Sequence, residues 1–281
     1  DAAEGDCARG ARSPIFGKRG VFPMAQAAKR IRIRIGIGGW TFEPWRGTFY
    51  PEGLAQKREL EHASRALTTI EVNGTYYGSQ KPASFRKWHD ETPDDFVFSL
   101  KAPRFATNRK VLTEAGESIA RFFASGVLEL GDKLGPINWQ FMATKKFEPE
   151  DFAAFLGLLP KSVEGRVIRN VVEVRHASFA MPEFVALIRA HEVAAVVAGD
   201  SDHPVIADPT ASFVYARIMG TRTDEAAGYA PAELDAWASR AAAWAGGAAA
   251  EGVARDVFLY VIGGAKERNP AAAMALLDRL G

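Results

Sequence analysis

The chain has 281 residues, of which 47% are hydrophobic, so it can bury one large core or two average ones. Its 35 basic and 34 acidic residues leave a formal charge of +1, which argues against a protein that coats polyanions with its whole surface. The single cysteine, Cys7, excludes an internal disulfide framework and a cysteine metal cluster. No apolar run is long enough to span a membrane and no secretory signal segment is evident, so we expect a cytoplasmic protein without membrane contacts.

Residues 1–32 are rich in Gly, Ala, Arg and Lys and have little periodic apolar pattern. Such a segment cannot bury enough apolar surface to fold. We therefore expect a disordered basic leader at 1–32, in which Met24 is a plausible alternative start, followed by one folded domain at 33–281.

Short β-rich segments alternate with helix-like segments from Ile33 onward. The expected strands cover 32–39, 67–73, 96–101, 137–141, 170–175, 193–200, 213–220 and 256–263. Amphipathic helices are expected at 118–134, 149–159, 182–192 and 231–245, where apolar residues recur at three- and four-residue spacing. This order predicts a parallel α/β architecture. Eight strands, and no Gly-rich dinucleotide fingerprint after the first, favour a single (β/α)₈ TIM barrel over a doubly wound sheet.

The connection between the sixth and seventh strands breaks the regular pattern. Residues 200–211 are few and contain two prolines, so they are a poor fit to a helix. We expect the barrel to have an irregular crossover at this point.

Acidic residues lie on the alternating face of several strands, near their C-terminal ends. Glu71 and Glu173 share the inward parity of their strands, and Asp200 closes the sixth strand, so all three are candidate catalytic groups at the barrel mouth. Carboxylates in different environments can act as acid and base. Alternatively, Glu71 pairs with Lys101, and Glu173 pairs with Arg175 or Arg217, in a purely structural role.

Cations end three strands and follow two others. We expect the substrate-binding groups to be Trp40, Asn73, Tyr76, Lys101, Gln140, Arg175, Arg217, Arg222 and Lys266. The loops after the last two strands of a TIM barrel often bind phosphate, and arginine is a bidentate donor to anions. Arg222 and Lys266 lie in those loops. The alternative is that both loops are flexible and their bases are solvated.

His176 follows Arg175 directly and is the best placed of the five histidines for proton transfer, although a hydrogen-bonded structural role is as compatible with its position. Asp200, Glu173, His176 and His203 could together ligate a divalent metal. Their spacing is not diagnostic of a metal site, so the cofactor is left unknown and a metal is not favoured.

Aromatic residues cluster after the first two strands, including Trp40, Trp45, Phe49 and Tyr76. They could stack on a sugar or a base, or form a hydrophobic cover for the barrel. We expect a cover for Trp45 and Phe49. Trp40, at a strand end, is the better candidate for ligand contact.

Several motifs in this order resemble the DUF72 (YecE-like) family. The resemblance rests on GIGGWTFEPWRGTFYPEG (36–53), on the segments 70–103 and 133–141, and on VEVRHASF (172–179), YARIMGT (215–221) and YVIGGAKERNPAAA (260–273). It implies a TIM barrel and supplies no reaction. Two departures from the family pattern remove polar groups near the mouth: Thr107-Asn108 stands for Thr-His, and Ile262-Gly263-Gly264 for Phe-Asn-Asn.

Two functional classes follow. The first is an enzyme, of hydrolase, lyase or isomerase type, that binds an anionic or phosphorylated small molecule and moves protons with its mouth carboxylates or His176. The second is a protein that binds or processes nucleic acid through mouth Arg and Lys side chains and aromatic loops. A ligand-binding scaffold without catalysis also fits the fold. The oligomeric state is not predicted.

Overall fold

Eight parallel strands form a closed barrel in the computed structural model, which describes residues 32–248 and 252–281. Around the barrel the strand order is β1-β10-β9-β8-β7-β4-β3-β2. The strands are β1 (Ile33–Gly38), β2 (Thr69–Val72), β3 (Val97–Lys101), β4 (Leu134–Gln140), β7 (Asn170–Glu173), β8 (Ala194–Ala198), β9 (Phe213–Ile218) and β10 (Asp256–Val261). The prediction of a TIM barrel is confirmed. The predicted leader lies outside the described residues except for Arg32.

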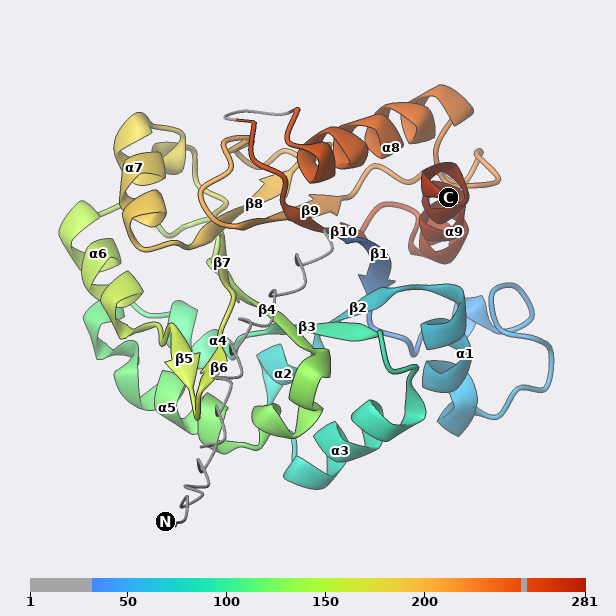
Figure 1. Cartoon of the computed structure of the whole chain (residues 1–281), viewed down its shortest axis with the longest axis horizontal. Helices are drawn as coiled ribbons and strands as arrows, with labels where there is room; N and C mark the ends of the chain where they lie inside the picture. The colour runs from blue at the N-terminus through green and yellow to red at the C-terminus, as the bar shows by residue number, and fades with distance from the viewer. Residues whose placement is uncertain (1–31, 249–251) are drawn as a thin grey trace, which may run out of the picture. The chain divides into compact units, whose positions relative to one another are not determined.

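Helices surround the strands on the outside of the barrel, as Figure 1 shows. They are α1 (Glu59–Ala66), α3 (Pro82–Glu91), α5 (Gly116–Ala124), α6 (Pro149–Leu158), α7 (Pro182–Ala190), α8 (Pro231–Gly246) and α9 (Asn269–Leu280). Four of them begin at a proline, whose fixed φ and missing N–H suit the first helical turn. None of these helices, among the residues that the structure describes, is long and apolar enough to cross a membrane.

The helix predicted at 118–134 is interrupted. α5 ends at Ala124, and Gly126 then has a φ of 102°, which turns the chain into a separate 3₁₀ segment, Val127–Lys133. A Cβ at Gly126 would lie 2.8 Å from atoms of Pro82 at the start of α3. A glycine is therefore required here both by the backbone angle and by the close approach of the neighbouring helix.

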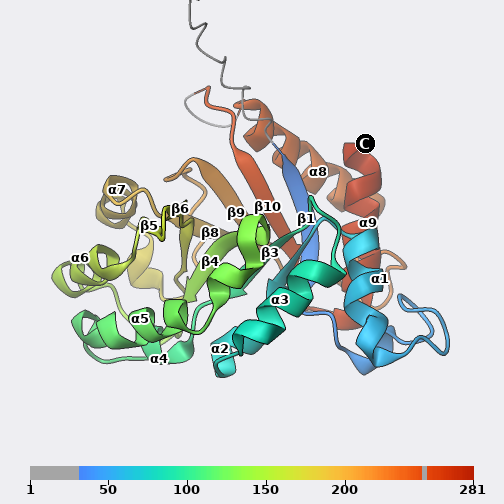
Figure 2. The same cartoon turned by 60° about the horizontal axis from the view of Figure 1, so that its bottom comes forward.

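Two very short helices lie in the loops at the C-terminal ends of the strands. α2 (Gly74–Tyr77) follows β2 and α4 (Arg104–Thr107) follows β3, and Figure 2 shows both at the lower end of the barrel. The described residues 199–212, between β8 and β9, hold no helix, which confirms the predicted irregular crossover. A hairpin of β5 (Ser162–Val163) and β6 (Arg166–Val167) stands apart from the barrel sheet.

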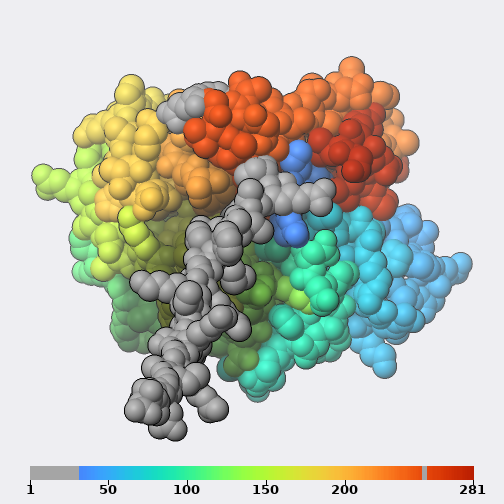
Figure 3. All heavy atoms as spheres, in the orientation of Figure 1, coloured from blue at the N-terminus to red at the C-terminus, as the bar shows by residue number. Residues whose placement is uncertain are grey.

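The barrel closes where the first and last strands meet. β1 pairs with β10 and with β2, and Figure 3 shows the red C-terminal segment beside the blue and cyan segment that includes β1 and α1. A Cβ on Gly36 would lie 2.0 Å from the carbonyl oxygen of Thr69 on β2. The close approach of β1 and β2 therefore depends on glycine at this position.

Side chains of the strands divide into two sets. Those facing outward form the larger core with the helices, including Ile35, Ile70, Leu100, Ile137 and Leu259. Those facing inward form a smaller apolar cluster of Val97, Val171, Ala194, Val196, Phe213, Tyr215, Phe258 and Tyr260. Inward-facing polar residues follow this cluster toward the C-terminal ends of the strands, as the alternation of the sequence predicts.

Candidate functional site

A buried layer of charge crosses the barrel interior. Arg217 of β9 donates from Nη1 to Oε2 of Glu173 at 2.6 Å and from Nη2 to Oε1 of Glu71 at 3.2 Å. Asn138 of β4 donates from Nδ2 to both carboxylates, at 3.3 Å to Glu71 and 3.1 Å to Glu173. We call Glu71, Asn138, Glu173 and Arg217 the ion-pair layer. It joins four strands through charge-assisted hydrogen bonds.

The environment keeps Glu173 and Arg217 of the ion-pair layer charged. Burial alone would raise the pKa of the Glu173 carboxyl, but Arg217, Arg175 and Lys101 outweigh that cost and lower the pKa to about 2. Burial disfavours the charged form of Arg217, yet the two carboxylates outweigh it and raise the pKa of the guanidinium. Glu173 is therefore an ionised, weakly basic carboxylate near neutral pH, which suits a fixed negative charge better than a proton acceptor.

A layer of hydroxyl groups supports the carboxylates from below. The Tyr215 hydroxyl donates to Oε2 of Glu71 at 2.5 Å and also contacts Ser99 Oγ at 2.8 Å. Beside this pair, on strands β2 and β10, which flank β1, Thr69 Oγ1 lies 2.9 Å from the Tyr260 hydroxyl. Burial, followed by the charge of Glu71, raises the pKa of Tyr215 well above its ordinary value, so its phenol stays protonated and remains a donor.

Above the ion-pair layer lie Arg175, Lys101 and Gln140, which we call the upper layer. Arg175 donates from Nε at 2.9 Å and from Nη2 at 2.6 Å to Oε1 of Glu173. Its Nη1 forms no hydrogen bond within the described residues and is available to a ligand.

Lys101 ends β3 and is 7% exposed. Its Nζ lies 4.8 Å from the centre of the Tyr76 ring, but within the described residues it forms neither a hydrogen bond nor an ion pair. Burial lowers the pKa of the ammonium group; Glu71 opposes this shift, and Arg217 adds to it. Lys101 is thus a buried cation whose charged form is poorly stabilised.

Three buried polar atoms in this part of the barrel have no hydrogen-bond partner among the described residues. They are Oδ1 of Asn138, Oε1 of Gln140 and Nε of Arg217. Buried polar atoms in native proteins are nearly always paired, so such a concentration needs a reason. A polar ligand that enters the mouth would supply partners to this group.

A cleft beside the mouth brings together three further predicted binding residues. It has a volume of about 290 Å³ and is lined in part by Trp40, Asn73 and Lys266, from the loops after β1, β2 and β10. Lys266 Nζ lies 4.2 Å from the centre of the Phe42 ring. The neighbouring Trp45 is fully buried, as expected for a hydrophobic cover. Its Nε1 donates to the backbone carbonyl oxygen of Lys266.

Asp200 occupies a different kind of place. Its Oδ1 accepts from the backbone N–H of Met219, and its Oδ2 accepts from the N–H of Gly220 at 3.0 Å and from the Tyr229 hydroxyl at 2.6 Å. These bonds join the end of β8 to the end of β9. Both carboxylate oxygens are engaged with the protein, so we do not retain Asp200 among the proposed catalytic groups.

His176 caps the short 3₁₀ helix Ala177–Phe179. Its Nδ1 accepts from the backbone N–H of Ser178 at 3.1 Å. A backbone N–H can only donate, so in the neutral ring the proton resides on Nε2. His176 is half-buried at the rim, and its capping bond gives it a structural role beside any part in proton transfer.

Polar groups in the loops after β9 and β10 bind one another or the start of α8. Arg222 binds Glu233 at the start of α8 with both Nη atoms, at 3.1 and 2.7 Å. Thr221 Oγ1 donates toward Gly263 and Ala265, and Thr221 O accepts from the N–H of Ala265. The phosphate site expected in these loops therefore has few free donors, and Arg222 is left out of the proposed site.

Asp200, Glu173, His176 and His203 are the residues that the sequence offers as possible metal ligands. Among residues 32–248 and 252–281, no group of three or more His, Cys, Asp and Glu side chains is placed to hold a metal ion. Burial, followed by the charge of Arg175, lowers the pKa of His203. That cation disfavours a further positive charge at this rim.

Two residues of the site were not chosen as site residues from the sequence. Asn138 and Tyr215 share the inward parity that selected Glu71 and Glu173, and they contact those carboxylates directly. The alternation in 134–140 and 213–218 places both side chains inward. It does not mark them as site residues, because neutral side chains are common on inward strand faces.

Relatives of the chain carry the same family description. A family model described as "Protein of unknown function DUF72" matches residues 34–281. The UPF0759 protein YecE of Escherichia coli (strain K12) is 29% identical over 150 residues, which are 52% of this chain and 50% of that protein. The chain thus spans about half the length of the curated relative that it matches.

Solved structures of the same family share the fold. A DUF72 family protein from Thermotoga maritima has a TM-score of 0.69 and 22% identity, with 88% of this chain and 98% of that chain covered. A DUF72 family protein from Enterococcus faecalis has a TM-score of 0.66 and 15% identity, with 88% and 95% covered. The family resemblance of the sequence is confirmed, and the chain belongs to the DUF72 family.

Proposed function

We propose that this protein is an enzyme that binds a small anionic molecule at the C-terminal mouth of its barrel. The observation that carries the proposal is Lys101, a buried ammonium group without an ion-pair partner among the described residues. Among the residues that the structure describes, Glu71 and Glu173 are the acids that face Lys101, Arg175 and Arg217, so this cluster has one uncompensated positive charge. Buried charges are usually compensated, and a bound anion would complete the balance.

The ligand would lie on the upper layer and extend into the adjoining cleft. Arg175 offers Nη1 to a carboxylate or phosphate, and Gln140 offers Oε1 to a hydroxyl or amide donor. Trp40, Asn73, Tyr76 and Lys266 supply the surrounding contacts. Glu71 and Glu173 then serve as fixed charges that hold Arg217 and Arg175, while proton transfer falls to Lys101 and to His176 at the rim.

Isothermal titration of the full chain with inorganic phosphate and with a sugar phosphate tests the proposal. We expect binding by the wild type, weakened about tenfold or more by Arg175→Gln, because one charge-assisted contact is worth about 1.5–3 kcal/mol. Arg222→Gln is the matched control, since its guanidinium is engaged with Glu233, and it should bind as the wild type does. Equal affinity of all three proteins, or no binding by any of them, would contradict the proposal.

A second candidate function, the binding of single-stranded nucleic acid, is favoured by the loops after β3 and β4. Within the described residues, Arg104, Lys110 and Lys146 form no ion pair, while Phe105 is 59% and the nearby Tyr77 66% exposed. Bases stack on exposed aromatic rings, and unpaired cations bind phosphates.

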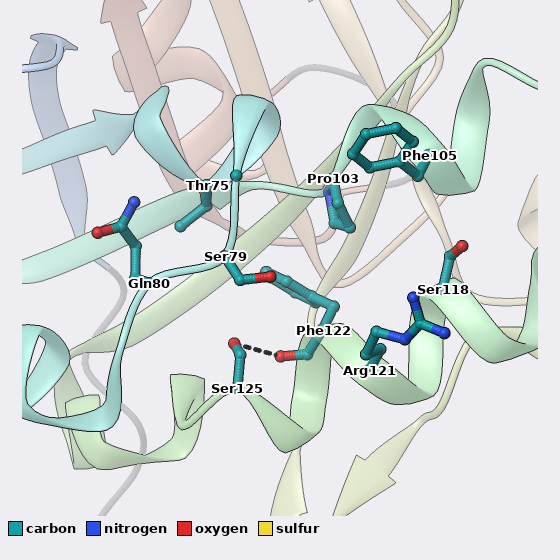
Figure 4. Close-up of a pocket in the computed structure, with 10 residues that line it drawn as sticks. Thr75, Ser79, Gln80, Pro103, Phe105, Ser118, Arg121, Phe122 and Ser125 are labelled. Carbon is teal, nitrogen blue, oxygen red and sulfur yellow. Dashed lines mark hydrogen bonds between the residues drawn. The ribbon is translucent and has the colours of Figure 1, made fainter.

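Beside Phe105 lies a pocket of about 160 Å³ between α2, α4 and α5. Figure 4 shows the Phe105 ring at one side of it, with the hydroxyl-bearing side chains of Ser79, Ser118 and Ser125 around the rest. A flat, polar-edged base would suit such a lining. An electrophoretic shift with single-stranded DNA at several salt concentrations, lost in Phe105→Ala, would support this function; no shift at low salt would remove it.

We also propose a cytoplasmic location, which the single cysteine of the sequence favours. Fractionation of cells that produce the full chain tests it.

A further inference from the structure

Two lysines are buried in the part of the chain that the structure describes, and their surroundings differ. Lys133 is 4% exposed, and its Nζ donates to the carbonyl oxygens of His89 and Thr92 and to Thr92 Oγ1. Lys101 is 7% exposed and, within the described residues, its Nζ donates to no acceptor. The first lysine has all three donors engaged at the C-terminal end of α3. The second has its amine at the end of a barrel strand, where catalytic groups collect in this fold.

The surroundings of Lys101 favour a reactive amine. Its Nζ has no hydrogen-bond acceptor within the described residues. The face of the Tyr76 ring, whose centre lies 4.8 Å from Nζ, attracts the charged form, but burial lowers the pKa of the amine. A larger fraction of its amine is therefore neutral at a given pH than in an exposed lysine. The neutral amine is the nucleophile in reactions of lysine with carbonyl compounds.

We propose that Lys101 is a nucleophilic amine that forms an imine with a small aldehyde or ketone that also carries a carboxylate or phosphate. The inference rests on the proposed function, because it assumes that the mouth accepts an anion. The lone pair of Nζ attacks the carbonyl carbon while the carbonyl π electrons move to oxygen, and a proton passes from the nitrogen to that oxygen to give a neutral carbinolamine. The hydroxyl takes up a second proton from solvent and leaves as water, and the nitrogen lone pair forms the carbon–nitrogen double bond of a positively charged iminium.

The neighbouring charges fit the steps of this reaction. Arg175 Nη1 is free within the described residues to hold the anionic end of the substrate beside Lys101. Glu71 and Glu173 act on Lys101 by favouring its positive form, so they would also favour the positive iminium. The anionic end of the attached substrate adds a negative charge beside the iminium, and this charge stabilises it further.

Reductive trapping of the full-length wild-type protein tests the inference. The protein is incubated at neutral pH with glyoxylate and cyanoborohydride, which delivers hydride to the imine carbon and leaves a stable carboxymethyl secondary amine. Intact mass and peptide mapping then locate the adducts. We expect the first adduct on Lys101, ahead of exposed lysines such as Lys57 and of Lys133. Acetaldehyde, which lacks the carboxylate, should show a weaker preference for Lys101 than glyoxylate does.

Two variants sharpen the experiment. Lys101→Arg keeps the positive charge but removes the reactive amine, so it should lose the preferred adduct, while Lys133→Arg should retain it. The mapping of the wild type decides the question even if a variant does not fold. If glyoxylate labels exposed lysines first while phosphate still binds by titration, the imine is overturned and the proposed function stands. If phosphate does not bind either, the proposed function fails as well.

Discussion

Arg217 and Lys101 are two buried cations of one barrel interior, and the contrast between them defines the site. Arg217 is enclosed by two carboxylates that come from strands on different sides of the barrel. Lys101 lies a short distance further toward the mouth and, within the described residues, pairs with no acid. A charge with partners stabilises the structure that surrounds it, whereas a charge without partners lowers stability and is retained where it serves a ligand or a reaction.

The largest expected effect concerns Arg217. Replacement by methionine would leave Glu71 and Glu173 buried beside each other without their shared cation. Loss of one member of a buried pair typically costs about 3–5 kcal/mol, so we expect Arg217→Met to lower the free energy of unfolding by that amount. Urea denaturation followed by circular dichroism measures it.

The triple variant Glu71→Gln/Glu173→Gln/Arg217→Met is the matched control. It removes the charges together, so it should regain a large part of the stability lost in the single variant. If the triple variant were less stable than Arg217→Met, the ion-pair layer would not be the cause of the loss.

The second prediction concerns acid. The pKa of Glu173 is about 2 in the folded protein and ordinarily 4.5, so the folded state favours the ionised form. The stability that follows is fully present above pH 4.5 and is lost as the pH falls toward 2; at about 1.4 kcal/mol per unit it amounts to about 3 kcal/mol. Unfolding measured between pH 5 and about 2 should show this slope in the wild type.

Glu173→Gln cannot titrate at this position, so its slope over the same interval should be smaller. Parallel slopes in the two proteins would show that other carboxylates govern the acid transition and that Arg217 and Arg175 do not hold Glu173 as described.

The third prediction has the opposite sign. Lys101→Met replaces an unpaired buried ammonium by an apolar side chain of similar length, and we expect the free energy of unfolding to rise by about 1 kcal/mol. Lys133→Met removes an ammonium with three hydrogen bonds and should lower it by about 1–3 kcal/mol. Thermal melts of both variants compare them directly. A loss of stability in Lys101→Met equal to that in Lys133→Met would end the contrast between the two lysines.

The smallest effect is expected at Arg222. Its bonds to Glu233 are short, but both side chains are about two-fifths exposed. Surface ion pairs are worth about 0–1 kcal/mol and are screened by salt. Arg222→Ala should therefore change the urea midpoint little, and less still in 1 M salt. A loss as large as that of Arg217→Met would mean that burial does not separate the two arginines.

The strands were predictable because side-chain alternation survives in the sequence. All eight barrel strands overlap their predicted segments, and the inward placement of Glu71, Glu173 and Arg217 follows from that period. Several helices were not predicted, among them α3 and α9. Both overlap segments that carry the DUF72 resemblance, 70–103 and 260–273, and helix formation there depends on packing against the barrel.

The partners of the charged residues could not be predicted equally well. Whether Glu173 pairs with Arg175, with Arg217 or with both depends on the strand order and on rotamers, and the structure shows both pairs. Asp200 lies at a strand end, as predicted, yet its contacts include two backbone N–H groups that directly follow another strand, β9. The sequence alone does not indicate which backbone groups a side chain contacts in the folded protein.

The bond between Arg217 and Glu71 joins residues that are 146 positions apart. During synthesis the first half of the barrel exists before Arg217 has been made, and Glu71 then has no guanidinium to bind. An early half-barrel would have to leave this carboxylate in water, which keeps that side of the sheet open. Burial of Glu71 becomes favourable only when β9 arrives with its cation, and the barrel closes when β10 then pairs with β1, so the ion-pair layer links late synthesis of the chain to completion of the fold.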